Sequence, residues 1–83
     1  MTPETFQTIM QQMARADRVF GEFASTHEAL GVALEEWDEF REAIRTNDKD
    51  EVQNECIDLV CVLLRLHKQL DESAALRKRS GME

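Results

Sequence analysis

The chain has 83 residues, of which 17 are acidic and 10 are Lys or Arg, so its net charge is −7. This length makes one domain (residues 1–83) with a small core, and chains of this size often gain stability by oligomerising. The negative charge argues against a nucleic-acid polymer or an anionic membrane as the main partner, because both are negatively charged themselves.

The first predicted helix begins just after Thr2, which suits the N-cap position, while Pro3 suits the first helical position. Apolar residues then recur at spacings of three and four, which predicts a helix that runs to about Phe23. The residues of this stripe are Phe6, Ile9, Met10, Met13, Ala16, Phe20 and Phe23.

The second predicted helix starts with a capping box, in which Ser25 and Glu28 satisfy each other's free backbone donors. Its expected inner face consists of Leu30, Ala33, Trp37, Phe40 and Ile44. Aromatic residues at helical spacing belong to a core more often than to a ligand site. We therefore expect Phe20, Phe23 and Trp37 to be core residues.

The third predicted helix follows a polar break at residues 46–48 and is apolar nearly all round beyond Val52. Such a helix is buried by its own chain and by a second subunit. Residues 71–79 predict a short fourth helix. The expected fold is therefore an all-α antiparallel bundle of three long helices plus a short C-terminal helix, completed by oligomerisation.

Two acidic pairs lie at equal distances on either side of Asn47. Glu39 and Glu55 are each eight residues from Asn47, and Glu36 and Asp58 are each eleven residues from it. If the two helices pack antiparallel, a rise of about 1.5 Å per residue brings both pairs to the same height. Residues three apart share a helix face, so four carboxylates would converge on one small volume. Like charges that close repel unless a cation lies between them, which predicts a metal site.

The alternative is that these acids form a solvated face, since pairs at this spacing also arise by chance in an acidic chain. It stays open for Glu35 and Asp38. It explains Glu55 and Asp58 poorly, because both adjoin the most apolar part of the chain and burying an unpaired carboxylate is costly. Pairing with arginine is the other structural explanation. Ligands that are all carboxylates favour Mg²⁺, with Mn²⁺ as a substitute, and no His follows a Glu at the spacing of a di-iron bundle site.

The EEWDE run at residues 35–39, a 15-residue gap and the ECID run at residues 55–58 resemble a known signature. It is the EExxE…ExxD motif of the all-α nucleoside triphosphate pyrophosphohydrolases, which include MazG-like proteins, dimeric dUTPases and dCTP pyrophosphatases. The resemblance covers residues 30–70 and implies hydrolysis of a (d)NTP to (d)NMP and pyrophosphate at the α–β phosphate linkage. It makes five acids catalytic, of which the last four are Mg²⁺ ligands: Glu35, Glu36, Glu39, Glu55 and Asp58. Glu35 would be a supporting acid or a water-orienting group. Members of the family generally work as homodimers or homotetramers.

The expected chemistry is metal-assisted attack of water on the α–β phosphate linkage. One to three Mg²⁺ ions would bind phosphate oxygens and orient the water, and a nearby carboxylate would accept its proton. The basic candidates for binding phosphate are Arg65, Lys68, Arg77 and Lys78. A solubilising charge run explains the tail equally well. The competing class is a non-catalytic helical oligomeric interaction or regulatory module with the same fold.

Targeting and disulfide signals are absent from the sequence as printed. The MTPE start has no basic segment followed by an apolar run, and the apolar stretch near residues 56–66 is too short and interrupted to span a bilayer. Cys56 and Cys61 lie on different faces of a helix, so a disulfide between them is not expected. The sequence therefore predicts a cytoplasmic protein.

Overall fold

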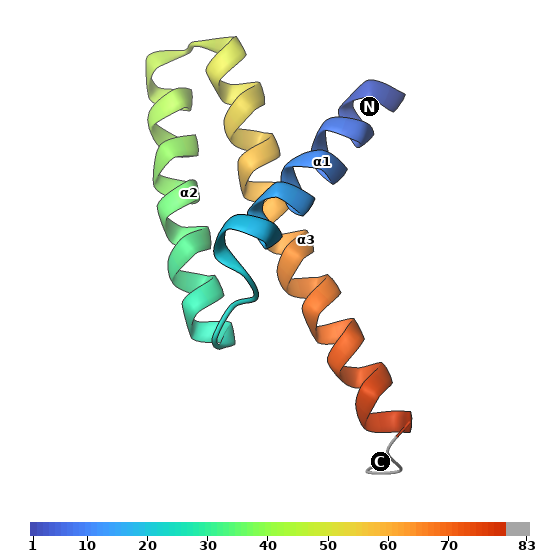
Figure 1. Ribbon diagram of the computed structural model, residues 1–83. Helices are drawn as coiled ribbons and strands as arrows, with labels where there is room; N and C mark the ends of the chain where they lie inside the picture. The colour runs from blue at the N-terminus through green and yellow to red at the C-terminus, as the bar shows by residue number, and fades with distance from the viewer. Residues whose placement is uncertain (80–83) are drawn as a thin grey trace.

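A computed structural model describes residues 1–79 and contains three α-helices and no strand in that range. The helices are α1 (Pro3–Phe20), α2 (Thr26–Thr46) and α3 (Lys49–Arg79). α2 and α3 form an antiparallel hairpin, and α1 crosses α3 obliquely (Figure 1). Among the described residues α1 packs on α3 but not on α2. The predicted all-α class is confirmed.

The start of α1 agrees with the sequence, but its end does not. The Thr2 side chain accepts a hydrogen bond from the Thr5 backbone N–H at 3.2 Å, as expected of an N-cap. The helix ends at Phe20, because Gly21 adopts a positive φ of 72° and its N–H caps the Asp17 carbonyl at 3.0 Å. Phe23 therefore lies in the connecting loop.

The capping box at the start of α2 forms in a shifted version. The Glu28 backbone N–H donates to Ser25 Oγ at 3.1 Å, as predicted. The Glu28 carboxylate accepts from the Ala24 N–H at 3.0 Å, one residue before the expected donor. At the other end, Asn47 caps α2 in the left-handed conformation (φ 57°, ψ 33°), and this tight turn leads directly into α3.

The predicted short fourth helix is wrong as a separate element. Residues 71–79 continue α3 without a break, so α3 is one helix of 31 residues. The segment holds neither Gly nor Pro to end the helix, and α3 extends well past the start of α2 (Figure 1). Within the described part of the chain, no helix has the length and apolar character needed to cross a membrane.

The core consists of two small apolar clusters on either side of α3. In the first, Ile9 and Met13 of α1 pack on Cys61. In the second, Phe23 packs on Ala29 and Val62, which confirms the prediction that Phe23 is a core residue. Gln69 holds the loop in place, since its amide both accepts from the Phe23 N–H and donates to the Phe23 carbonyl at 2.9 Å.

Many large apolar side chains lie outside this core. Phe20 is 78% exposed and Trp37 is 46% exposed, so the expectation that they are core residues is wrong for the single chain. Seven of the exposed residues on α2 and α3 recur at intervals of three, four and seven along their own helix, which places each set along one face. We call them the outer apolar stripe: Leu30, Leu34, Trp37, Ile44, Val60, Leu63 and Leu70.

The predicted inner face of α2 is only partly correct, since of its residues Ala33 packs against the second core cluster. Small residues, Ala29 and Ala43, are the buried ones on this helix, whereas Leu30 and Ile44 are exposed. Small side chains let α2 approach α3 closely, and the larger ones are left facing outward. Oligomerisation would cover them, but the single chain does not test that prediction.

Candidate metal centre

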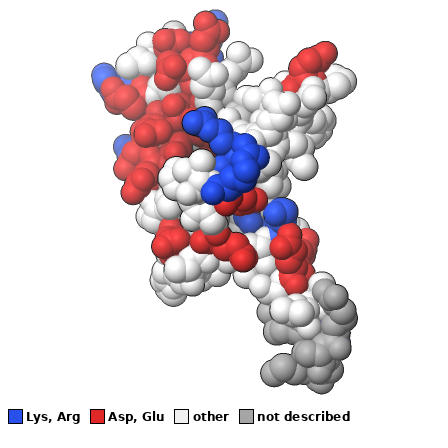
Figure 2. Space-filling view, viewed as in Figure 1, with Lys and Arg blue, Asp and Glu red and all other residues white. Residues whose placement is uncertain are grey.

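The hairpin brings the four predicted ligands together. Glu36 and Glu39 come from α2, and Glu55 and Asp58 come from α3. Each offers one carboxylate oxygen, and these oxygens all lie within 4.8 Å of one another. No other group of at least three potential metal ligands occurs among the described residues. Acidic side chains gather visibly over the α2–α3 hairpin (Figure 2).

Burial distinguishes these acids from a solvated face. Glu36, Glu55 and Asp58 are partly buried, and only Glu39 is exposed. Glu36 Oε2 and Glu55 Oε2 are shielded from solvent and accept no hydrogen bond from the described residues. A buried carboxylate oxygen without a donor is unfavourable, and a cation among the four acids would satisfy it.

The pKa shifts within the group also indicate that uncompensated negative charge is unfavourable there. Burial, followed by the charges of Glu39 and Asp58, raises the pKa of Glu36 from 4.5 to about 7. Burial and the same two neighbours also raise the pKa of Glu55. Carboxylates held this close repel one another, and protonation of Glu36 relieves part of that repulsion. Without a cation the site therefore favours taking up a proton.

The oxygen positions suit a small divalent cation. Octahedral Mg²⁺ holds its oxygens at about 2.0–2.1 Å, so opposite ligands are about 4.2 Å apart. The four oxygens lie within 4.8 Å of one another, which is close to that spacing. Carboxylate ligands without His or Cys favour Mg²⁺ or Mn²⁺ over Zn²⁺. The donor set therefore fits the predicted ion.

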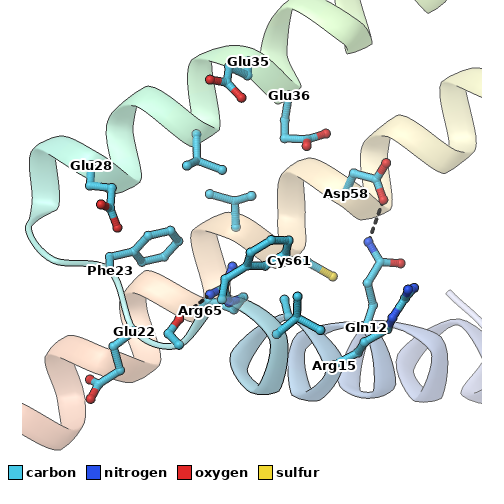
Figure 3. Close-up of a pocket in the computed structure, with 16 residues that line it drawn as sticks. Gln12, Arg15, Glu22, Phe23, Glu28, Glu35, Glu36, Asp58, Cys61 and Arg65 are labelled. Carbon is cyan, nitrogen blue, oxygen red and sulfur yellow. Dashed lines mark hydrogen bonds between the residues drawn. The ribbon is translucent and has the colours of Figure 1, made fainter.

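A residue from α1, which the sequence reasoning missed, completes the surroundings of Asp58. Gln12 Nε2 donates a hydrogen bond to Asp58 Oδ1 at 2.6 Å (Figure 3). The two residues are 46 positions apart, so no local motif could have revealed the contact. The available signal was a polar residue directly beside the buried Met13 on an apolar helix.

Arg65, a predicted phosphate ligand, is engaged within the chain. It is 8% exposed, and its guanidinium donates to Asp17 Oδ1 at 3.0 Å and to the Gly21 carbonyl at 2.9 Å. It also lies over the Phe23 ring, 4.6 Å from the centroid. Although burial opposes it, pairing with Arg65 and Lys68 lowers the pKa of Asp17. These contacts tie the end of α1 and the loop to α3.

The other basic candidates lie farther along α3. Lys68 is exposed and pairs with Asp17 at 3.4 Å and with Glu72 at 3.5 Å. Lys78 follows Asp58 by 20 residues on the same helix, a separation of about 30 Å along the axis. The side chain of Arg77 lies outside the part of the chain that the structure describes. Within one chain, therefore, Lys78 is not brought near the acidic group.

A cleft of about 840 Å³ opens beside the acids, and α1, the loop before α2, α2 and α3 all line it. Glu36 and Asp58 line it, so it is continuous with the acidic group, and Glu35 lines it from the same turn of α2 (Figure 3). Arg15 of α1 lines it too and joins none of the ion pairs found among the described residues. The sequence reasoning foresaw neither the cleft nor Arg15, since both depend on how α1 docks.

Comparison with known proteins identifies no relative: no family model matches the chain, and no curated protein or solved structure matches it significantly. The similarity to the all-α nucleoside triphosphate pyrophosphohydrolases therefore stays a prediction from the motif and its spacing. What the structure adds is the geometry of the acidic group.

Proposed function

We propose that this chain is a Mg²⁺-dependent nucleoside triphosphate pyrophosphohydrolase of the MazG-like, all-α kind. It would hydrolyse a (d)NTP to (d)NMP and pyrophosphate. One observation carries the proposal: four carboxylates from both arms of the hairpin converge within 4.8 Å, and two of their oxygens are buried without a partner. The EExxE…ExxD motif supplies the reaction class.

The proposed roles of the five acids follow from their positions. Glu36, Glu39, Glu55 and Asp58 would hold the ion, which when bound supplies charge neutralisation at phosphate oxygens and a water of lowered pKa. Glu35 lies outside the group of four but lines the same cleft, so it can orient the attacking water or accept its proton. We assign Glu35 the role of supporting acid.

The cleft is the proposed substrate site. Its volume of about 840 Å³ lies within the ordinary range for small-molecule pockets, about 300–1,000 Å³. The triphosphate would lie at the end lined by Glu36 and Asp58, with the nucleoside toward Phe20 and Phe23. Arg15 is the best-placed basic side chain for a phosphate, because Arg65 and Lys68 are already paired with Asp17.

We further propose that the protein is a cytoplasmic homo-oligomer. The outer apolar stripe is too extensive for a chain of this size to leave in water, and a second copy would cover it by helix-on-helix packing. A dimer is the simplest closed assembly, and a tetramer would pair two such dimers. Cys56 and Cys61 are free thiols, which suits a reducing compartment.

The competing function is a non-catalytic helical interaction or regulatory module. The outer apolar stripe favours it, since such a surface binds protein partners, and the pairing of Arg65 and Lys68 within the chain removes two phosphate ligands. Such a module has no need of buried carboxylates without partners. We therefore rank it second.

Product analysis across a panel of canonical and damaged nucleoside triphosphates tests the proposal. The wild-type protein with Mg²⁺ should release the monophosphate and pyrophosphate in equal amounts, and EDTA should stop the reaction. Asp58→Asn should abolish turnover. Release of diphosphate and inorganic phosphate, or no release from any nucleotide, would contradict the proposal.

Asp38→Asn is the matched control for Asp58→Asn. Asp38 lies on α2 between two proposed ligands, but its side chain is exposed, and its one ion pair among the described residues is with Arg41, at 3.4 Å. The same chemical change should leave turnover near the wild-type rate. Equal losses in both variants would mean that general acidity, rather than the group of four, supports the reaction.

A further inference from the structure

The hydrogen bond between Gln12 and Asp58 connects two parts of the molecule that otherwise share few contacts. Among the described residues it is the only side-chain hydrogen bond made by any of the four acids. Gln12 lies on α1, which packs on α3 and not on α2. The metal site itself is built from α2 and α3. Through this contact, therefore, α1 reaches a site to which it contributes no ligand.

We infer that Gln12 is a positioning residue for the metal site, and that cation binding and the docking of α1 strengthen each other. The inference rests on the proposed function, because it requires a cation among the four acids. A carboxylate can bind an ion through one oxygen while the other accepts a hydrogen bond, and such outer partners typically improve metal affinity by about 10–100-fold. Gln12 binds Asp58 Oδ1, and Oδ2 would be the oxygen available to the ion.

The short and direct nature of the contact supports this role. At 2.6 Å the amide N–H meets a charged acceptor, which makes a stronger bond than a neutral pair. The bond is partly buried, so water competes with it less than at the surface. With Asp58 restrained in this way, its rotamer is set before the ion arrives.

The coupling between ion binding and the docking of α1 is reciprocal, because the two binding free energies are linked. If a docked Gln12 raises the affinity for the ion, the bound ion must favour the docked state of α1 by the same factor. The remaining anchors of α1 on α3 are mainly the cluster of Ile9, Met13 and Cys61, and the ion pairs of Asp17 with Arg65 and Lys68. A helix held by so small a core opens locally at low cost, so the effect of the ion should be measurable.

The test is Gln12→Met, which removes the donor and keeps an unbranched side chain of similar length and good helix propensity. Gln11→Met is the matched control, since Gln11 is the exposed neighbour on the same helix. The first readout is Mn²⁺ affinity without nucleotide, followed by electron paramagnetic resonance. We expect Gln12→Met to bind Mn²⁺ about tenfold or more weakly, and Gln11→Met to bind as the wild type does.

The second readout is hydrogen exchange of the amides at residues 9–17. Saturating Mg²⁺ should slow their exchange in the wild-type protein and in Gln11→Met, but not in Gln12→Met. Wild-type exchange that Mg²⁺ leaves unchanged would overturn the inference even if Gln12→Met failed to fold. Affinity of Gln12→Met within about twofold of the wild type would also overturn it.

The failure of this inference is distinguishable from the failure of the proposed function. If the wild-type protein binds Mn²⁺ and hydrolyses nucleotide while Gln12→Met behaves identically, only the role of Gln12 is lost. If the wild-type protein binds no Mn²⁺, the metal site and the role of Gln12 are both overturned.

Discussion

Glu36 on α2 and Asp58 on α3 lie eleven residues before and after the left-handed Asn47, and the hairpin brings their carboxylates within 4.8 Å. Both side chains also line the same cleft. The relationship concentrates negative charge at one point of a small fold. The protein is therefore expected to store repulsion that a proton or a cation relieves.

The first consequence is an unusual dependence of stability on pH. Burial and neighbouring charges raise the pKa of Glu36 to about 7, above its ordinary value of 4.5. The folded protein thus holds a proton that the unfolded chain releases, so the unfolding free energy should fall as pH rises from about 4.5 to about 7. The lowered pKa of Asp17 acts only below this window, since its ordinary value is 3.8.

Urea unfolding in EDTA at about pH 5 and about pH 8 measures this dependence. Metal-free protein should be less stable at the higher pH, and saturating Mg²⁺ should reverse the order, because the ion replaces the proton at high pH. Equal or greater stability of the metal-free protein at the higher pH would be the contrary result.

Removing one charge from the acidic group should stabilise the metal-free protein while destroying the proposed site. Glu36→Gln mimics the protonated side chain, so we expect its Tm in EDTA at about pH 8 to rise by about 4–8 °C, the shift that about 1 kcal/mol makes in a domain of this size. Mg²⁺ should then add little. Glu42→Gln is the control, because Glu42 is exposed and paired with Arg45 at 2.6 Å. A lower Tm for Glu36→Gln would contradict the prediction.

Arg65 should prove structural rather than substrate-binding. Its side chain is 7% exposed and Asp17 is 35% exposed, so Arg65→Met should cost about 2–4 kcal/mol of unfolding free energy, discounted for the exposed partner. Arg15→Met should leave the Tm unchanged and raise KM for the nucleotide by about tenfold. Urea unfolding and steady-state kinetics distinguish the two. A stable Arg65→Met variant with a raised KM would reverse these assignments.

The outer apolar stripe should mediate self-association. Leu63 is 52% exposed on α3, and a charge at its position would lie in the proposed interface. Sedimentation velocity should show an oligomer for the wild type and a monomer for Leu63→Glu. Met10→Glu is the control, since Met10 is 64% exposed on α1 and outside the stripe. A wild-type protein that stays monomeric across the accessible concentrations would exclude the interface.

The local features of the fold were readable from the sequence because short-range chemistry determines them. Thr2 and Ser25 are N-caps, and the turn at Asn47 sets the register that brings Glu39 and Glu55 together. The caps depend on residues within one turn, and the register of the acids depends on regular helix geometry over about three turns on each side of Asn47. Helix caps and equal offsets about a turn therefore predicted the acidic group.

The position of α1 on α3 could not be predicted from the sequence, because it depends on a few contacts between residues far apart in sequence. Gln12 meets Asp58 and Asp17 meets Arg65 across 46 and 48 positions, and neither pair has a local signature. The Arg15-lined cleft follows from this docking and was missed with it. Contacts of this kind are set by tertiary packing.

The inner face of α2 was predicted only in part, for a different reason. Hydrophobic periodicity marks a face that avoids water, but it does not say whether the same chain or a second chain covers that face. Leu30 and Trp37 were expected to face α3, whereas Ala29 and Ala43 do so. If the chain self-associates as proposed, these larger apolar residues would form the intermolecular contact.

Binding of Mn²⁺ to the wild-type protein and to Asp58→Asn, followed by electron paramagnetic resonance without nucleotide, decides whether the acidic group holds a divalent cation. We predict saturable binding to the wild type and to Asp38→Asn, and at least about tenfold weaker binding to Asp58→Asn. A gain in Tm on adding the ion should accompany binding and vanish in Asp58→Asn. Equally weak, non-saturable binding by the wild type and Asp58→Asn would contradict the proposed metal site.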